Sequence, residues 1–228
     1  MGQVVLILGN SGNGKSASLR NMKRNECMIF NTAGKLLPFK NDLKCINLRN
    51  LSTYERYQYI EGGIKKYQDK IKSFIVDDAQ FLMAFELLDR ANERGYDKFT
   101  EIAKRWIDLM DSIGKANDDV IVYFLMHTEY DNTNQSYKSK TVGKMVDQYV
   151  SPESLATIVL GAHCKDGRYF FTTHNGGNDT VKSPIGMFEE DEIDNDLKLV
   201  DTTIRDYYGF GKETKNESVW NWWSDWKF

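Results

Sequence analysis

Residues 9–16 read Gly-Asn-Ser-Gly-Asn-Gly-Lys-Ser and fit the pattern G-x-x-x-x-G-K-[ST] at every fixed position. In this phosphate-binding loop (Walker A), glycines let the backbone wrap around a polyphosphate with its N–H groups pointing inward. An apolar, β-rich run at residues 3–8 precedes the loop, and a helix is predicted at residues 17–24. Strand, loop and helix therefore stand in the order that such a site requires.

The loop predicts a role for each of its side chains. We expect Lys15 to reach the β- and γ-phosphates and Ser16 to ligate Mg²⁺. The expected cofactors are thus ATP and Mg²⁺, although no base-specific motif separates ATP from GTP. The residues expected to bind the nucleotide are Gly9, Asn10, Ser11, Gly12, Asn13, Gly14, Lys15, Ser16 and Ala17.

Residues 70–78 read Lys-Ile-Lys-Ser-Phe-Ile-Val-Asp-Asp, a hydrophobic strand that ends in two acids, as in a Walker B element. Asp77 is expected to hold the Mg²⁺ shell, and Asp78 stands where an acid would orient the attacking water. A second apolar strand, residues 119–126, has the composition of a central parallel strand and ends at His127. His127 is the candidate sensor of the γ-phosphate; the alternative is a solvent-facing histidine at a strand end.

The remaining pattern predicts an α/β fold with a mainly parallel sheet and a late β-hairpin. Helical periodicity is expected near residues 79–94 and 99–115, and at residues 54–68, where Tyr54, Tyr57, Ile60, Ile64 and Tyr67 share one face although Gly62-Gly63 interrupts it. Two late strands flank the turn at residues 165–167. The acids of residues 188–196 suit a helix start, which Leu197, Val200, Ile204, Tyr207 and Tyr208 would continue with an inward face. Shorter strands are expected at residues 26–31 and 43–48.

Composition limits the class of protein. With 228 residues, 41% hydrophobic and 28% charged, the chain suits one soluble domain at residues 1–208 and a tryptophan-rich tail at residues 209–228. A net charge of −3 excludes a generally basic surface, so any DNA contact must be local. The three cysteines lack C-x-x-C spacing, and neither a membrane span nor a secretory signal is visible, so we expect a cytoplasmic protein without disulfides or zinc.

Three segments are candidates for contacts with partners. Residues 130–144 are polar and amide-rich, which predicts a mobile loop running into a short helix; this loop either contacts single-stranded DNA or is simply solvated. The late hairpin tip would present a cation to a neighbouring subunit's nucleotide, or carry only exposed turn charges. The tail holds four of the five tryptophans, at residues 218–228, and would dock on the chain's own core, on a neighbour, or on a partner. The DNA candidates are Tyr137, Lys138, Lys140 and Lys144, and the hairpin cations are Lys165 and Arg168.

Walker A, Walker B and a polar-tipped strand, in this order, resemble the additional-strand class of P-loop ATPases, in which a further strand lies between the first strand and the Walker B strand. More narrowly, the loop at the amino terminus, Phe-Ile-Val-Asp-Asp at residues 74–78, and the segments 182–188 and 192–197 resemble small phage-encoded ATP-binding proteins with a RecA-like core. Some members of that family are single-strand annealing recombinases. The resemblance implies a three-layer RecA-like domain, Mg²⁺·ATP binding, weak hydrolysis, self-association into a ring or filament, single-stranded DNA as the polymer, and the host cytoplasm. Asp78 stands where recombinase ATPases normally carry glutamate.

The sequence therefore predicts an ATPase that acts on single-stranded DNA in phage recombination or replication. One rival is an ATP-gated protein-interaction module, such as a helicase-loading or packaging accessory, whose tail grips a partner. A P-loop nucleotide kinase is a weaker rival, because it would need an arginine-rich lid and the chain has no arginine from Leu109 to Gly167.

Overall fold

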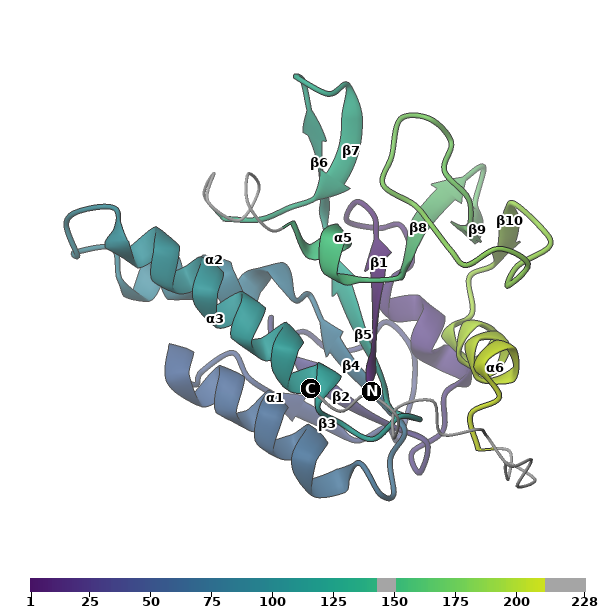
Figure 1. Ribbon diagram of the computed structural model, residues 1–228, viewed down its shortest axis with the longest axis horizontal. Coiled ribbons are helices and arrows are strands. Elements are labelled where there is room, and N and C mark those ends of the chain that lie inside the picture. Colours follow the sequence, from purple (N-terminus) through teal and green to yellow (C-terminus); the bar gives the residue numbers. More distant parts are fainter. Residues whose placement is uncertain (143–150, 212–228) are drawn as a thin grey trace, which may run out of the picture.

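The computed structural model describes residues 1–142 and 151–211, and an eight-stranded sheet forms its centre (Figure 1). The strand order is β10-β9-β8-β1-β5-β4-β2-β3. Neighbours from β8 to β3 run parallel, whereas β9 and β10 are antiparallel additions at one edge. The chain is thus an α/β protein with a mainly parallel sheet and a late antiparallel hairpin, as predicted. The strands are β1 (Gln3–Leu8), β2 (Cys27–Asn31), β3 (Cys45–Asn47), β4 (Ser73–Asp77), β5 (Ile121–Met126), β8 (Ile158–Lys165), β9 (Arg168–Thr172) and β10 (Glu192–Asp194).

Strand β5 lies between β1 and β4, so a further strand does separate the first strand from the strand that carries the paired acids. Val122 of β5 pairs with Val4 on one side and with Phe74 on the other. Every residue of β5 is buried, which explains its unbroken apolar sequence. Because the three strands are parallel, the residues that follow them come together at one edge of the sheet.

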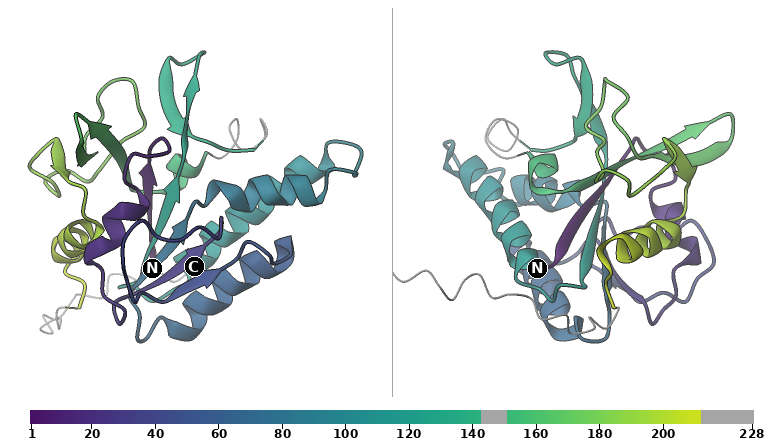
Figure 2. Two further views of the ribbon diagram at one scale, coloured as in Figure 1. Left: turned by 180° about the vertical axis from the view of Figure 1, so that it is seen from behind. Right: turned by 45° about the vertical axis from the view of Figure 1, so that its right-hand side comes forward.

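Helices cover both faces of this sheet (Figures 1 and 2). Alternate side chains of β1 divide between two cores: Leu6 packs in the same core as Trp106, and Val5 in the same core as Val200. The first core lies under α1, α2 and α3, and the second under η1 and α6. The helices are η1 (Ser16–Asn21), α1 (Thr53–Tyr67), α2 (Gln80–Asp89), α3 (Asp97–Gly114), α5 (Pro152–Leu155) and α6 (Leu197–Tyr208).

The helix after the glycine-rich loop differs from the expected α-helix over residues 17–24. It is a 3-10 helix that ends at Asn21, although Leu19 and Met22 are buried as predicted. Its end is fixed from outside, because the Asn21 amide donates to a carboxylate oxygen of Asp196 (2.6 Å), the residue that caps α6. A contact distant in sequence thus sets the length of this element.

Helix α1 runs without a break through Gly62-Gly63. A Cβ atom at Gly63 would lie 2.7 Å from Cζ of Phe30, so the missing side chain lets the helix approach β2 closely. The inward face holds Tyr57, Ile60 and Ile64, as expected. The inward placement of Tyr54 was wrong: its side chain is 65% exposed, because it lies in the first turn, ahead of that face.

Residues 128–139 correct the prediction of a mobile loop. They form an antiparallel hairpin of β6 (Thr128–Asp131) and β7 (Ser136–Ser139), in which Tyr130 pairs with Tyr137 and their ring centroids lie 5.1 Å apart. A search for alternating apolar residues does not find this hairpin, because both of its faces are largely polar. Besides the tyrosine pair, the contacts across it include those of Lys138 with Glu129 and Asp131. The predicted short helix falls largely on residues 143–150, which lie outside the described residues.

Only the last acid of the stretch at residues 188–196, Asp196, takes part in a helix start. Residues 192–194 form β10, whose Ile193 pairs with Phe171 of β9. Helix α6 begins only after Asp196, whose carboxylate accepts a hydrogen bond from the Lys198 N–H (2.9 Å). Tyr207 and Tyr208 at the helix end are 44% and 37% exposed, so the predicted inward face stops at Ile204.

The tryptophan-rich segment at residues 218–228 lies outside the described residues. None of the helices in the described parts of the chain combines the length and the apolar character needed to cross a lipid bilayer.

Candidate functional site

The glycine-rich loop joins β1 to η1 at the carboxyl edge of the sheet, and two of its glycines are required by the backbone. Gly14 has a φ of +84°, and a Cβ atom there would lie 2.7 Å from the Tyr169 ring. A Cβ atom at Gly9 would lie 2.5 Å from the carbonyl oxygen of Ala162 on β8. The motif therefore has a local structural cause as well as the chemical one inferred from sequence.

Lys15 lies buried at the base of the loop. Its Nζ donates to the carbonyl oxygens of Gly9 (2.6 Å) and Asn10 (2.9 Å). Burial lowers the pKa of Lys15 to about 8, against the opposing effect of the nearby Asp78 and Asp77 carboxylates. The loop thus holds one cation close to two acids, with its ammonium group satisfied by main-chain oxygens.

Ser16 and Asp77 form the contact that joins the two sequence motifs. The Ser16 hydroxyl donates to both carboxylate oxygens of Asp77, at 2.9 and 3.0 Å, across 61 residues of sequence. Burial, followed by the charge of Asp78, raises the pKa of Asp77 to about 6. A hydroxyl and a carboxylate oxygen are ligands that Mg²⁺ accepts. Because no cluster of three or more metal-binding side chains occurs within residues 1–142 and 151–211, a cation here would draw its other ligands from phosphate and water.

Asp78 and His127 meet at the ends of adjacent strands β4 and β5. His127 Nε2 lies 3.3 Å from Asp78 Oδ1, and the backbone N–H of His127 donates to the side-chain oxygen of Gln80 (3.2 Å). Asp78 adopts a φ of +55°, an uncommon conformation for a residue with a side chain and one that clusters at functional sites. The predicted water-orienting acid and the predicted sensor are therefore direct neighbours.

A third group, Lys35, contacts the same acid and was missed by sequence reasoning. Its Nζ lies 2.8 Å from Asp78 Oδ2. Burial opposes ionisation of Asp78, but hydrogen bonds from His127 and Lys35 outweigh it and hold the pKa of Asp78 well below its usual range. Lys35 follows β2, and β2 is the parallel neighbour of β4, so a topology with these two strands adjacent would have placed Lys35 at this edge.

All these side chains open into one cleft of about 340 Å³. Tyr169 of the late hairpin lines the cleft beside the loop, a second residue that the motifs did not indicate. Six of the nine expected nucleotide-binding residues also line it. The exceptions are Gly9, Asn10 and Asn13, which line a separate cavity of about 260 Å³. The cleft is lined by Ser11, Gly12, Gly14, Lys15, Ser16, Ala17, Lys35, Leu36, Pro38, Asp77, Asp78, His127 and Tyr169.

The DNA candidates lie outside this cleft, on the β6–β7 hairpin and just beyond it. Tyr137 packs against Tyr130, and Lys138 lies 3.8 Å from Glu129 and 3.6 Å from Asp131, so neighbouring acids offset its charge. Lys140 donates its backbone N–H to the carbonyl oxygen of His127 (2.7 Å), which ties β7 to the strand end in the cleft. Lys144 lies outside the described residues.

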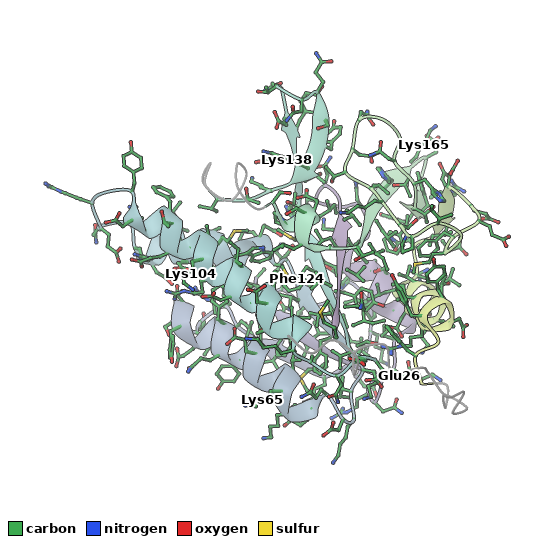
Figure 3. The ribbon with its side chains drawn as sticks, viewed as in Figure 1. Glu26, Lys65, Lys104, Phe124, Lys138 and Lys165 are labelled. Carbon is green, nitrogen blue, oxygen red and sulfur yellow. The ribbon has the colours of Figure 1, made fainter. Side chains whose placement is uncertain are left out.

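The proposed trans-acting cations face each other across the late hairpin turn. Lys165 pairs with Arg168 in the β8–β9 register, and the Arg168 guanidinium forms an ion pair with Glu192 of β10. Figure 3 shows Lys138 and Lys165 on two projections that rise from the same edge of the sheet. Arg168 is therefore already partnered within its own chain.

No protein-family model matches the chain, and a search of curated proteins finds no match. The chemistry of the cleft and the strand order are thus the grounds on which a function is inferred.

Proposed function

We propose that this chain is a Mg²⁺-dependent P-loop ATPase with a RecA-like core of the additional-strand class. The observation that carries the proposal is the Ser16–Asp77 contact, because it joins the last position of the loop motif to the acid of the Walker B pattern. The position of β5 between β1 and β4 supports the additional-strand class. Lys15 and the Asp78–His127 pair line the same cleft. The cleft thus has a cation to bind phosphate and an acid to orient water, which transfer of phosphate to water requires.

In the proposed mechanism the chain's own groups act mainly by position and charge. The loop amides and Lys15 bind the phosphates, and Ser16 with Asp77 would hold Mg²⁺. Bound Mg²⁺ supplies neutralisation of the charge that develops on the phosphate oxygens. Asp78 accepts a hydrogen bond from the attacking water, and His127 fixes the orientation of Asp78 from the neighbouring strand.

His127 also connects the cleft to the β6–β7 hairpin. Strand β6 begins at the next residue, Thr128, whose hydroxyl donates to the Asn10 side chain of the loop (2.8 Å). The start of the hairpin is thus bonded to the phosphate-binding loop. We propose that single-stranded DNA on this hairpin, in a self-associated form of the protein, is the polymer that the ATPase serves; the family resemblance is the ground for this part.

The experiment that tests the proposal is steady-state ATP hydrolysis by the purified protein with Mg²⁺, with and without a single-stranded oligonucleotide. Lys15→Ala is the site variant, because it removes the buried cation of the loop. Lys104→Ala is the matched control, since Lys104 is a 72% exposed lysine on α3, away from the cleft. Figure 3 marks its position on that helix.

We expect turnover in wild type and in Lys104→Ala, and none in Lys15→Ala. Stimulation by the oligonucleotide would support the DNA-dependent form of the proposal. Turnover that is unchanged by the oligonucleotide would favour the ATP-gated interaction module as the physiological role, with a protein as its partner. Equal activity in all three proteins would refute the assignment of the site.

A further inference from the structure

Lys35 is a second cation in the cleft, and neither sequence motif includes it. Its side chain is 64% exposed and reaches Asp78 Oδ2 at 2.8 Å, while Nζ lies 5.6 Å from the centre of the Phe81 ring. Burial is the main cause of the lowered pKa of Lys15, and the charge of Lys35, which lines the same cleft, lowers it further. The cleft therefore presents two lysines to whatever binds between them.

The chain builds the position of Lys35 from a strand end. Asn31, the last residue of β2, is 5% exposed and pairs with Asp77 in the sheet. Its side-chain oxygen accepts from the Gly34 N–H (2.7 Å), and its amide nitrogen donates to the carbonyl oxygen of Lys35. One buried side chain thus fixes both ends of the Gly34–Lys35 peptide beside the acids of β4. The Lys35 side chain itself is 64% exposed and is held by its ion pair with Asp78.

We propose that Lys35 is a phosphate-binding residue that leaves Asp78 and binds the terminal phosphate of a nucleoside triphosphate. The inference rests on the proposed function, which it deepens by naming the residue that distinguishes triphosphate from diphosphate. Lys15, Asp78 and Lys35 line the same cleft, so a triphosphate held by Lys15 would lie within reach of Lys35.

Charge favours the exchange. A terminal phosphate carries more negative charge than one carboxylate and offers three oxygens, and hydrogen bonds from an ammonium to phosphate are among the stronger ones in proteins. The Lys35 side chain is 64% exposed, so its ammonium group stays accessible to water during the exchange, and the buried Asp78 carboxylate keeps its contact with His127. A lysine on its flexible four-carbon stem can make such a move while its backbone stays fixed.

The exchange also changes what Asp78 can do. In the structure Oδ1 of Asp78 faces His127 and Oδ2 faces Lys35. Departure of Lys35 frees Oδ2 to accept a hydrogen bond from water, while His127 still holds Oδ1. A nucleoside diphosphate leaves the Lys35–Asp78 pair in place, because it lacks the third phosphate that Lys35 would bind. Oδ2 of Asp78 is thus available to water only when a nucleoside triphosphate occupies the cleft.

The test compares the affinities for two nucleotides in four proteins. Dissociation constants for a non-hydrolysable ATP analogue and for ADP, both with Mg²⁺, would be measured by calorimetry for wild type, Lys35→Gln, Lys35→Arg and Lys40→Gln. Lys40 is an exposed lysine a few residues further along the same loop and does not line the cleft. It controls for the loss of one positive charge from this loop.

We expect Lys35→Gln to weaken binding of the ATP analogue by about tenfold or more, the effect of one charge-assisted hydrogen bond. Binding of ADP should change by less than about threefold, and Lys35→Arg should recover most of the loss. Lys40→Gln should match wild type for both nucleotides. Thermal unfolding of all four proteins would check that the fold is kept.

An equal effect of Lys35→Gln on both nucleotides, or none on either, would overturn the role of Lys35 while leaving the nucleotide site intact. Failure of the wild-type protein to bind either nucleotide is a different result. It would refute the proposed function itself, and the inference with it.

Discussion

Replacing Asp78 by asparagine tests the proposed chemistry at one atom. Asparagine keeps the size of the side chain and one accepting oxygen. Its NH2 group cannot accept the hydrogen bond that the Lys35 ammonium donates to Asp78 Oδ2, and it lacks the negative charge that would orient water. Positioned groups of this kind contribute about 10²–10⁴-fold to rate, or about 3–5 kcal/mol of activation free energy. We therefore expect the turnover of Asp78→Asn to fall at least about a hundredfold.

Binding should survive the same substitution. The charge of Asp78 is the second cause of the raised pKa of Asp77, after burial, so removing it moves that pKa back toward its ordinary value. Asp77 then remains a carboxylate at neutral pH and can still ligate Mg²⁺. The substitution also removes the ion pair with Lys35, whose side chain is 64% exposed. This loss should lower the free energy of unfolding by about 0–1 kcal/mol and change Tm by no more than about 4 °C.

The assay is single-turnover phosphate release at saturating nucleotide, accompanied by calorimetric binding of the ATP analogue. Asp108→Asn is the matched control, because Asp108 also pairs with a lysine, Lys104 (2.7 Å), but on the exposed face of α3. Phosphate release by Asp78→Asn within about fivefold of wild type would refute the role of Asp78. Loss of nucleotide binding together with turnover would instead show that Asp78 shapes the site.

Two further predictions concern stability and thiol reactivity. Asp201 is 3% exposed and accepts hydrogen bonds from Ser73, from Tyr123 and from the Arg205 guanidinium. Asp201→Ala should therefore lower the free energy of unfolding by about 3–5 kcal/mol and Tm by at least about 6 °C, measured by calorimetry. Burial raises the pKa of the Cys27 thiol to about 12. A thiol reagent should therefore modify the exposed Cys164 in the native protein and Cys27 only after unfolding, as followed by mass spectrometry. Modification of Cys27 in the native protein would contradict its placement in the core.

The parts of the cleft that the sequence predicted are those carried by short, continuous motifs. Gly14 and Lys15 lie in one loop whose backbone is fixed by glycines, and Asp77 and Asp78 lie at the end of one strand. Ser16 and Asp77 were each assigned to Mg²⁺ from their own motif, and they meet because the strands that carry the two motifs end at the same edge of a parallel sheet. Local chemistry and one rule of sheet geometry were sufficient there.

The parts that the sequence did not predict depend on pairing between distant segments. Lys35 lies beside Asp78 only because β2 pairs with β4, and no local pattern at residues 32–38 indicates this. Tyr169 lies against Gly14 because the β8–β9 hairpin returns beside the loop. Neither side chain belongs to a motif with fixed spacing from the glycines, so motif reading had no means of finding them.

Two segments formed strands although their composition favoured other structures. In the β6–β7 hairpin the paired side chains are mostly polar and partly exposed, so the alternation that marks a half-buried strand is absent. Strand β10 is only three residues long and acidic, which suits the outer edge of a sheet, where charge discourages further pairing. In both cases backbone pairing with a neighbouring strand decided the structure, and side-chain pattern did not.

The finding that residues 128–139 form a hairpin, and not a mobile loop, also bears on the proposed function. A mobile loop could contact DNA anywhere along its length, whereas a hairpin tied to the cleft at both ends can transmit a change. Lys140 bonds to the main chain of His127, and Thr128 bonds to Asn10 of the glycine-rich loop. A movement of His127 or of the glycine-rich loop would therefore reach both strands of the hairpin. Under the proposed function, these bonds would connect a nucleotide in the cleft to the surface proposed for DNA. We then expect oligonucleotide stimulation of turnover to require the Asp78–His127 contact, as hydrolysis does.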